Sequence, residues 1–312
     1  MKNHERKEKM APIKNVNRAF LIGLILFFNT GILSAYIISN SPFVNSNIAE
    51  TIVEIITYAT LTLPMILFAK SNFRGSKDII SIKINKQAIK DGLICAALAY
   101  PLMLMALFFA SKYNMRSEIT SEEIASVLTQ SSVIENIVRA VLIPAVVEEF
   151  VFRGCIFGVY SKKNTIVGIF LSSILFSLMH CNLYQIPYTV VGGIVFACSA
   201  YITDNIGTSI IGHFTVNLIS LGMHYMSESI NKYCPEKLIE IEGIITGLII
   251  AIGVAIATYL LIKLLRKQIK IKPLIAKDKD MRFSDFITLS LLFTLAILIL
   301  TTSITEGVST LV

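Results

Sequence analysis

The sequence NIVRAVLIPAVVEEFVFRGCIFGVY, residues 136–160, is an apolar run of 25 residues with only four charged side chains. A helix crosses the roughly 30 Å hydrocarbon core of a bilayer with about 20 such residues, so this run is long enough to span a membrane. Pro144 cannot donate a backbone hydrogen bond to the carbonyl of Ala140, and we expect the helix to be bent or locally opened there.

Similar runs recur along the 312-residue chain, which is 54% hydrophobic and only 16% charged. That composition is too apolar for a soluble globular domain. The candidate spans are 19–39, 51–69, 92–110, 137–159, 165–181, 186–203, 207–226, 243–264 and 286–304. We therefore predict an all-α, polytopic transmembrane helix bundle of eight or nine spans.

The distribution of Lys and Arg predicts the orientation, because cytoplasmic loops are enriched in positive charge. With a cytoplasmic N-terminus, 22 of the 28 Lys and Arg residues fall in inner segments and four in outer ones. The basic residues are spread over loops with no nucleic-acid motif beside them, so we expect contact with anionic lipid headgroups and no nucleic-acid partner. The predicted location is the cell membrane, as a multi-pass protein.

The chain divides by composition into four parts. Residues 1–18 form a basic cytoplasmic tail, and 19–135 hold the N-terminal spans with an outer segment, 111–136, that is either an amphipathic helix or a solvated loop. Residues 136–226 carry the chemistry, and 227–312 hold the C-terminal spans. The five cysteines include no C-x-x-C pair, so we infer neither a disulfide framework nor a zinc-thiolate site.

Placing an ionisable side chain in hydrocarbon costs free energy, so such a residue at mid-membrane indicates a functional site. Glu149 and Arg153 are four residues apart and share a helix face, where they can form a structural ion pair. Glu148 points about 100° away and has no opposite charge at helical spacing, which suits a general base or acid.

Two later spans add imidazoles and an amide. FSLMH places Phe176 and His180 one turn apart, and HFTVN does the same for His213 and Asn217, whereas His224 is expected at the surface. Each element alone is more often, or as often, a packing or helix–helix contact. Together they supply a base, a proton relay and oxyanion donors, as amide hydrolysis requires.

The ordered motifs EEFVFR (148–153), FSLMH (176–180) and HFTVN (213–217) resemble those of the CPBP family of intramembrane proteases. This family is also called the CAAX-protease and bacteriocin-processing, Abi or Ras-converting-enzyme-like family, and the resemblance covers roughly 138–222. It implies an endopeptidase in which Glu148 and His180 activate water while His213 and Asn217 hold the water or stabilise the oxyanion. Glu149 and Arg153 would support these residues, and Phe176 would wall the site.

Metal dependence is left open by the residues. Glu148, His180 and His213 could ligate zinc, but H-E-x-x-H is absent and a Glu-His site needs no metal. We therefore favour a glutamate-type hydrolase that requires no cofactor.

Other functions fit parts of the pattern. A proton-coupled transporter also places carboxylates and histidines at mid-membrane, although the polar residues here have no counterpart in a second repeat. A non-catalytic immunity or partner-binding protein could keep the same scaffold. For the enzyme, the resemblance allows CAAX-type trimming, leader-peptide or bacteriocin maturation, self-immunity or cleavage of another membrane peptide. Frequent Ile, Lys and Asn suggest an AT-rich bacterial genome, which favours a substrate without a prenyl group.

The predicted spans do not bring the candidate residues to one depth. His180 falls near the outer end of its span and His213 in the inner half of its own, with Glu148 between. Tilted helices, a re-entrant piece near 181–187 or shifted span ends would be needed to bring them together.

Overall fold

The computed structural model describes residues 2–40, 47–72, 81–112, 131–233 and 283–309, with a few isolated positions between 252 and 259. Within these ranges the only strand-like feature is an isolated bridge between Ser81 and Asn205. The all-α prediction is confirmed. Besides the helix that contains the opening sequence, the helices are α1 (Lys2–Asn40), α2 (Asn47–Asn72), α3 (Lys86–Lys112), α8 (Thr165–Leu178), α9 (Ile186–Thr203), α10 (Ile206–Tyr233), the short 3-10 helix η3 (Phe283–Asp285) and α12 (Leu289–Ser309).

Eight of the nine candidate spans coincide with described helices, and the ninth, 243–264, falls outside the described residues except for four isolated helical positions, 252, 253, 255 and 259. The same holds for most of the predicted outer segment, from 113 to 130. Five described helices are long and apolar enough to cross a membrane, and α8 and α12 are shorter apolar helices. Residues 2–18, predicted as a tail, are helical and continuous with the first span.

Residues 133–163 form one continuous helix, here called the composite helix, in which α-helical and π-helical turns alternate. Its parts are α5 (Val133–Asn136), η1 (Ile137–Leu142), α6 (Ile143–Glu148), η2 (Glu149–Phe157) and α7 (Gly158–Lys163). The first π-helical stretch ends beside Pro144, where the Ile143 N–H donates to the Val138 carbonyl five residues back. The predicted opening at Pro144 is therefore a widened helical turn, a feature common at functional sites.

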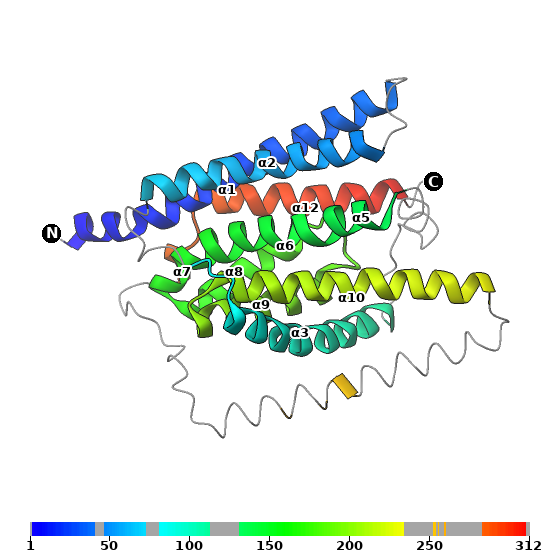
Figure 1. The fold of residues 1–312 in the computed structure, drawn as a ribbon. Coiled ribbons are helices and arrows are strands. Elements are labelled where there is room, and N and C mark those ends of the chain that lie inside the picture. The colour runs from blue at the N-terminus through cyan, green and yellow to red at the C-terminus, as the bar shows by residue number, and fades with distance from the viewer. Residues whose placement is uncertain are drawn as a thin grey trace.

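The helices lie side by side, with the composite helix and α8 in the middle (Figure 1). On one side α1 packs against α2 and α12, and on the other α3 packs against α9 and α10. The end of α7, with Lys162 and Lys163, lies at the end of the bundle where α1 begins, and α12 finishes at the opposite end. This grouping of basic residues agrees with the predicted orientation.

The outer surface is apolar, as expected where lipid is the solvent. Exposed side chains include Ile32 at 72%, Leu63 at 55% and Phe293 at 55%. The interior instead holds charged residues, since Glu149 and Arg153 are both 0% exposed. A soluble protein shows the reverse distribution, so the structure supports a membrane bundle.

The hairpin of α7 and α8 explains how Glu148 and His180 come to lie at the same depth in the bundle. Asn164 connects the two helices, and Glu148 and His180 each lie 16 residues from it in opposite directions along the chain. α8 has only 14 residues, so it rises about 21 Å and ends inside the bundle. His180 lies in the turn after α8, where Cys181 adopts a left-handed conformation with φ 50°. The turn therefore places His180 at the depth of Glu148.

Candidate active site

A cavity of about 540 Å³ opens beside the composite helix. All four predicted catalytic residues, Glu148, His180, His213 and Asn217, line it, as does Phe176. They come from the composite helix, the α8–α9 turn and α10. Three chain segments thus contribute to one site. The positions of these residues in the sequence did not show whether they would meet at one depth.

Behind the cavity lies a fully buried ion pair. Arg153 Nη1 is 2.9 Å from Glu149 Oε1, and the Arg153 Nη2 group donates to the carbonyl of Gly193 at 3.1 Å. The guanidinium also lies over the ring of Phe176, 4.4 Å from its centroid. The predicted pairing of Glu149 with Arg153 is present, and the cation is held by several partners as buried charges require.

Gly193 brings α9 close enough for this contact. A Cβ atom at this position would lie 2.9 Å from the Cβ of Ser173 on α8, which is closer than packed side chains allow. Only a glycine lets the two helices approach so closely. The short distance between them carries the Gly193 carbonyl to Arg153.

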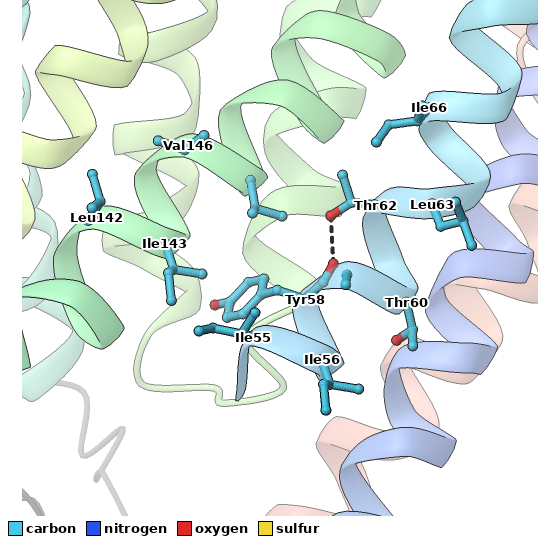
Figure 2. A pocket seen from close by; sticks show the side chains of 12 residues that line it. Ile55, Ile56, Tyr58, Thr60, Thr62, Leu63, Ile66, Leu142, Ile143 and Val146 are labelled. Carbon is cyan, nitrogen blue, oxygen red and sulfur yellow. Dashed lines mark hydrogen bonds between the residues drawn. The ribbon is translucent and has the colours of Figure 1, made fainter. Parts of the chain in front are cut away.

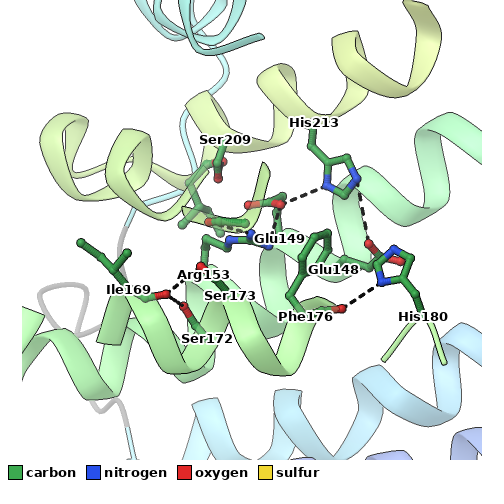
Figure 3. A network of polar contacts seen from close by, with 12 residues as sticks. Glu148, Glu149, Arg153, Ile169, Ser172, Ser173, Phe176, His180, Ser209 and His213 are labelled. Atoms are coloured by element: carbon green, nitrogen blue, oxygen red, sulfur yellow. Dashed lines mark hydrogen bonds and ion pairs between the residues drawn. The ribbon is translucent and has the colours of Figure 1, made fainter. Parts of the chain in front are cut away.

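His213 lies between the two adjacent carboxylates (Figure 3). Its Nδ1 is 3.0 Å from Glu149 Oε1, and its Nε2 is 3.9 Å from Glu148 Oε2. Because a carboxylate accepts hydrogen bonds, Nδ1 carries the hydrogen and Nε2 is left facing Glu148. The ring is stacked on Phe196 with centroids 5.0 Å apart, which fixes its plane.

The two oxygens of Glu148 have different surroundings. Oε1 accepts a hydrogen bond from the Tyr58 hydroxyl at 3.1 Å. Oε2 is buried and has no hydrogen-bond partner among the described residues, although His213 Nε2 is near it. A buried carboxylate oxygen without a donor is a group that calls for a ligand or a reactant.

His180 lies on the other side of Glu148 (Figure 3) and is oriented by its own helix. Its Nδ1 is 2.9 Å from the carbonyl oxygen of Phe176, and its ring meets the Phe176 ring edge to face at 5.1 Å. A carbonyl can only accept, so Nδ1 carries the hydrogen and neutral His180 has its lone pair on Nε2. Like Glu148, His180 lines both the main cavity and a smaller one of about 90 Å³.

Asn217 has a partner that the sequence did not predict. Its Nδ2 donates to the carbonyl of Ala140 at 3.2 Å. This is the carbonyl that Pro144 deprives of its helical donor. Asn217 therefore ties α10 to the widened turn of the composite helix, and its amide still lines the cavity.

Two contacts from α2 were missed by the sequence analysis. Tyr58 binds Glu148, and Arg139 pairs with Glu50 and Glu54 at 3.1 and 2.7 Å. The positions 50, 54 and 58 recur every four residues, so one face of an otherwise apolar span carries two carboxylates and a phenol. That spacing is the signal that could have identified α2 as part of the site.

The prediction that His224 lies at the surface was wrong. His224 is partly buried on α10 and lines the cavity with Ser220 and Leu221. His224 is near the end of the predicted span 207–226, but α10 continues to Tyr233, so His224 lies within the helix.

The donor groups around the cavity bear on whether the site could hold a metal ion. Within the described ranges no three His, Cys, Asp or Glu side chains are arranged to hold one ion. Both imidazoles are held through Nδ1, His213 by Glu149 and His180 by a backbone carbonyl. This leaves Nε2 of each ring available to accept a proton or to ligate a metal ion.

Residues 130–219 match the model of a protein family described as type II CAAX prenyl endopeptidase Rce1-like. This part of the chain is similar to that family and is called the Rce1-like segment below. The predicted resemblance to the CPBP proteases is confirmed there, and all three motifs fall inside the match. No curated protein and no solved structure gave a significant match.

The Rce1-like segment covers under a third of the 312 residues. It contains Glu148, His180, His213 and Asn217 but ends before His224 and begins after α2. The match supports intramembrane endopeptidase activity in general. Tyr58 lies outside the matched segment although it contacts Glu148.

Proposed function

We propose that this protein is an intramembrane endopeptidase of the glutamate type, which hydrolyses a peptide bond of a membrane-associated protein or peptide. The observation that carries the proposal is the unpartnered Oε2 of Glu148, which faces His213 Nε2 at 3.9 Å in a cavity also lined by His180. A separation of this size suits one bridging water. The Rce1-like match of residues 130–219 supports the same reaction class.

In the proposed reaction, Glu148 Oε2 takes a proton from the bridging water. The water oxygen then bonds to the scissile carbonyl carbon, and the carbonyl electron pair moves onto its oxygen. Collapse of this tetrahedral species breaks the C–N bond as the proton passes from Glu148 to the leaving nitrogen. Water is consumed, and one carboxyl group and one amine are formed.

The imidazoles have distinct proposed roles. His213, held through Nδ1 by Glu149, presents an unprotonated Nε2 that accepts a hydrogen bond from the water, and Nε2 donates to the oxyanion only after the ring takes up a second proton. Neutral His180 presents a lone pair at Nε2, which can accept a proton or orient the water. Asn217 has one amide hydrogen on the Ala140 carbonyl, so its second N–H is the one available to an oxyanion.

We further propose the cell membrane as location and a substrate that is itself membrane-associated. The cavity lies among helices whose outer faces are apolar, so a substrate must reach it from the bilayer or its surface. Within this class, leader-peptide or bacteriocin maturation, self-immunity and CAAX-type trimming share one chemistry. They differ in the amino-acid sequence beside the cleaved bond. Comparing membrane peptidomes determines that sequence.

The test compares the membrane peptidome of cells producing the wild-type protein with that of cells producing Glu148→Gln or His180→Ala. We expect a defined cleavage product with the wild type and none with either variant at equal membrane abundance. The matched control is Asp91→Asn on α3, a carboxylate that lies outside the cavity. Unchanged product with Glu148→Gln would overturn the proposal, and unchanged product with both variants would leave a non-catalytic membrane protein.

A further inference from the structure

Glu148 needs one free oxygen and one held oxygen to work as a positioned base, and the structure gives it both. Oε1 accepts from the Tyr58 hydroxyl, while Oε2 has no donor among the described residues. A carboxylate with two free oxygens could rotate about its last side-chain bond. The Tyr58 contact selects one orientation, the one in which Oε2 faces His213.

Tyr58 is brought to Glu148 by a fixed register between α2 and the composite helix. Glu50 pairs with Arg139, Tyr58 with Glu148, and the Met65 carbonyl with Cys155 Sγ. These pairs are 89, 90 and 90 residues apart in sequence, so the two helices run in the same direction without slipping. The Arg139 ion pairs and the Tyr58 contact therefore belong to one register between the two helices.

The Tyr58 ring is also held in place. It meets Phe27 of α1 edge to face, with centroids 5.8 Å apart. It forms part of the wall between the polar cavity of about 540 Å³ and an apolar groove of about 770 Å³ (Figure 2). The hydroxyl thus reaches Glu148 from an apolar environment, where a charge-assisted hydrogen bond is strong.

Resting on the proposed function, we infer that Tyr58 is a positioning residue for Glu148. It acts through the carboxylate, by holding Oε1 and leaving Oε2 to activate water. α2 is thereby part of the catalytic apparatus although it lies outside the Rce1-like segment.

The first test measures product formation in the membrane peptidome for Tyr58→Phe, which keeps the ring and removes the hydroxyl. We expect product to form about 10-fold more slowly, as for loss of one hydrogen bond to a charged group. Incorporating 3,5-difluorotyrosine at position 58, which restores a hydroxyl, should recover most of the rate. Tyr36→Phe, at a tyrosine that is 67% exposed on α1, is the matched control and should behave as wild type.

The second test needs no substrate. Infrared difference spectra of the purified protein in lipid nanodiscs, wild type minus Glu148→Gln, isolate the Glu148 carboxyl bands. The same difference in a Tyr58→Phe background should show these bands shifted, and in a Tyr36→Phe background unshifted. A residue that only fills space would not move them.

The two tests separate the possible failures. Glu148 bands unchanged by Tyr58→Phe, or wild-type product formation in that variant, would overturn the positioning role and leave the hydrolase proposal intact. Product that persists in Glu148→Gln would instead overturn the hydrolase proposal. Shifted bands would then still establish the Tyr58 contact, but as a structural one, and the positioning role would be rejected.

Discussion

The side-chain amide of Asn217 lies 3.2 Å from the carbonyl oxygen of Ala140, the acceptor that Pro144 leaves without its backbone donor. This contact therefore joins α10 to the composite helix at the point where Pro144 interrupts the backbone hydrogen bonds of the composite helix. Because the composite helix changes from π to α geometry at this point, the contact also fixes the turn that leads into Glu148.

Asn217→Ala is expected to lower the free energy of unfolding by about 1 kcal/mol, since it leaves a carbonyl without its partner. Pro144→Ala supplies a backbone donor for the same carbonyl, so the cost of Asn217→Ala should shrink in that background. Chemical unfolding of the four proteins in detergent gives the coupling. Equal costs in both backgrounds would mean that the Asn217 contact with Ala140 contributes nothing measurable.

Arg153→Met should destabilise the protein strongly. It leaves Glu149 buried without its cation, and breaking a buried pair by removing one partner typically costs about 3–5 kcal/mol. Arg139→Met is the matched control, because the Arg139 pairs are partly exposed and should cost about 1 kcal/mol or less. Thermal melting in detergent compares the two variants, and a similar loss in both would contradict this account of the buried pair.

Gly193→Ala is expected to push α9 away from α8, because the new Cβ would meet Ser173 at 2.9 Å. Overpacking of this kind costs about 1–3 kcal/mol, and the Gly193 carbonyl should also lose its contact with Arg153. Gly222→Ala on α10 has open space at the same atom and should be neutral or slightly stabilising. Melting temperatures of the two variants should therefore move in different directions, or only the first should move.

Treatment with a divalent-metal chelator should leave product formation unchanged, because the described donor groups do not converge on one ion. The measurement is the rate of product formation before and after dialysis against the chelator. Loss of activity that added zinc restores would show that Glu148, His180 and His213 rearrange to bind metal. Activity that persists would leave the Glu-His pair to activate water unaided.

The sequence was sufficient for the helical class, most helix positions and the Glu149–Arg153 pair, because these depend on local periodicity. It could not place His180 at the depth of Glu148, since the length of α8 is set by a turn that an apolar run does not reveal. The contact of Tyr58 with Glu148 depends on the register of two helices about 90 residues apart. Such a register is a property of packing, and no single span encodes it.

α8 has a consequence for the surrounding lipid. Its exposed apolar stripe consists of Ile166, Phe170 and Ile174, and the helix ends four residues later, after about 21 Å. A helix of that length is shorter than hydrocarbon about 30 Å thick, so its end and the α8–α9 turn lie at membrane depth. Acyl-chain length is therefore expected to influence how easily water and polypeptide reach His180.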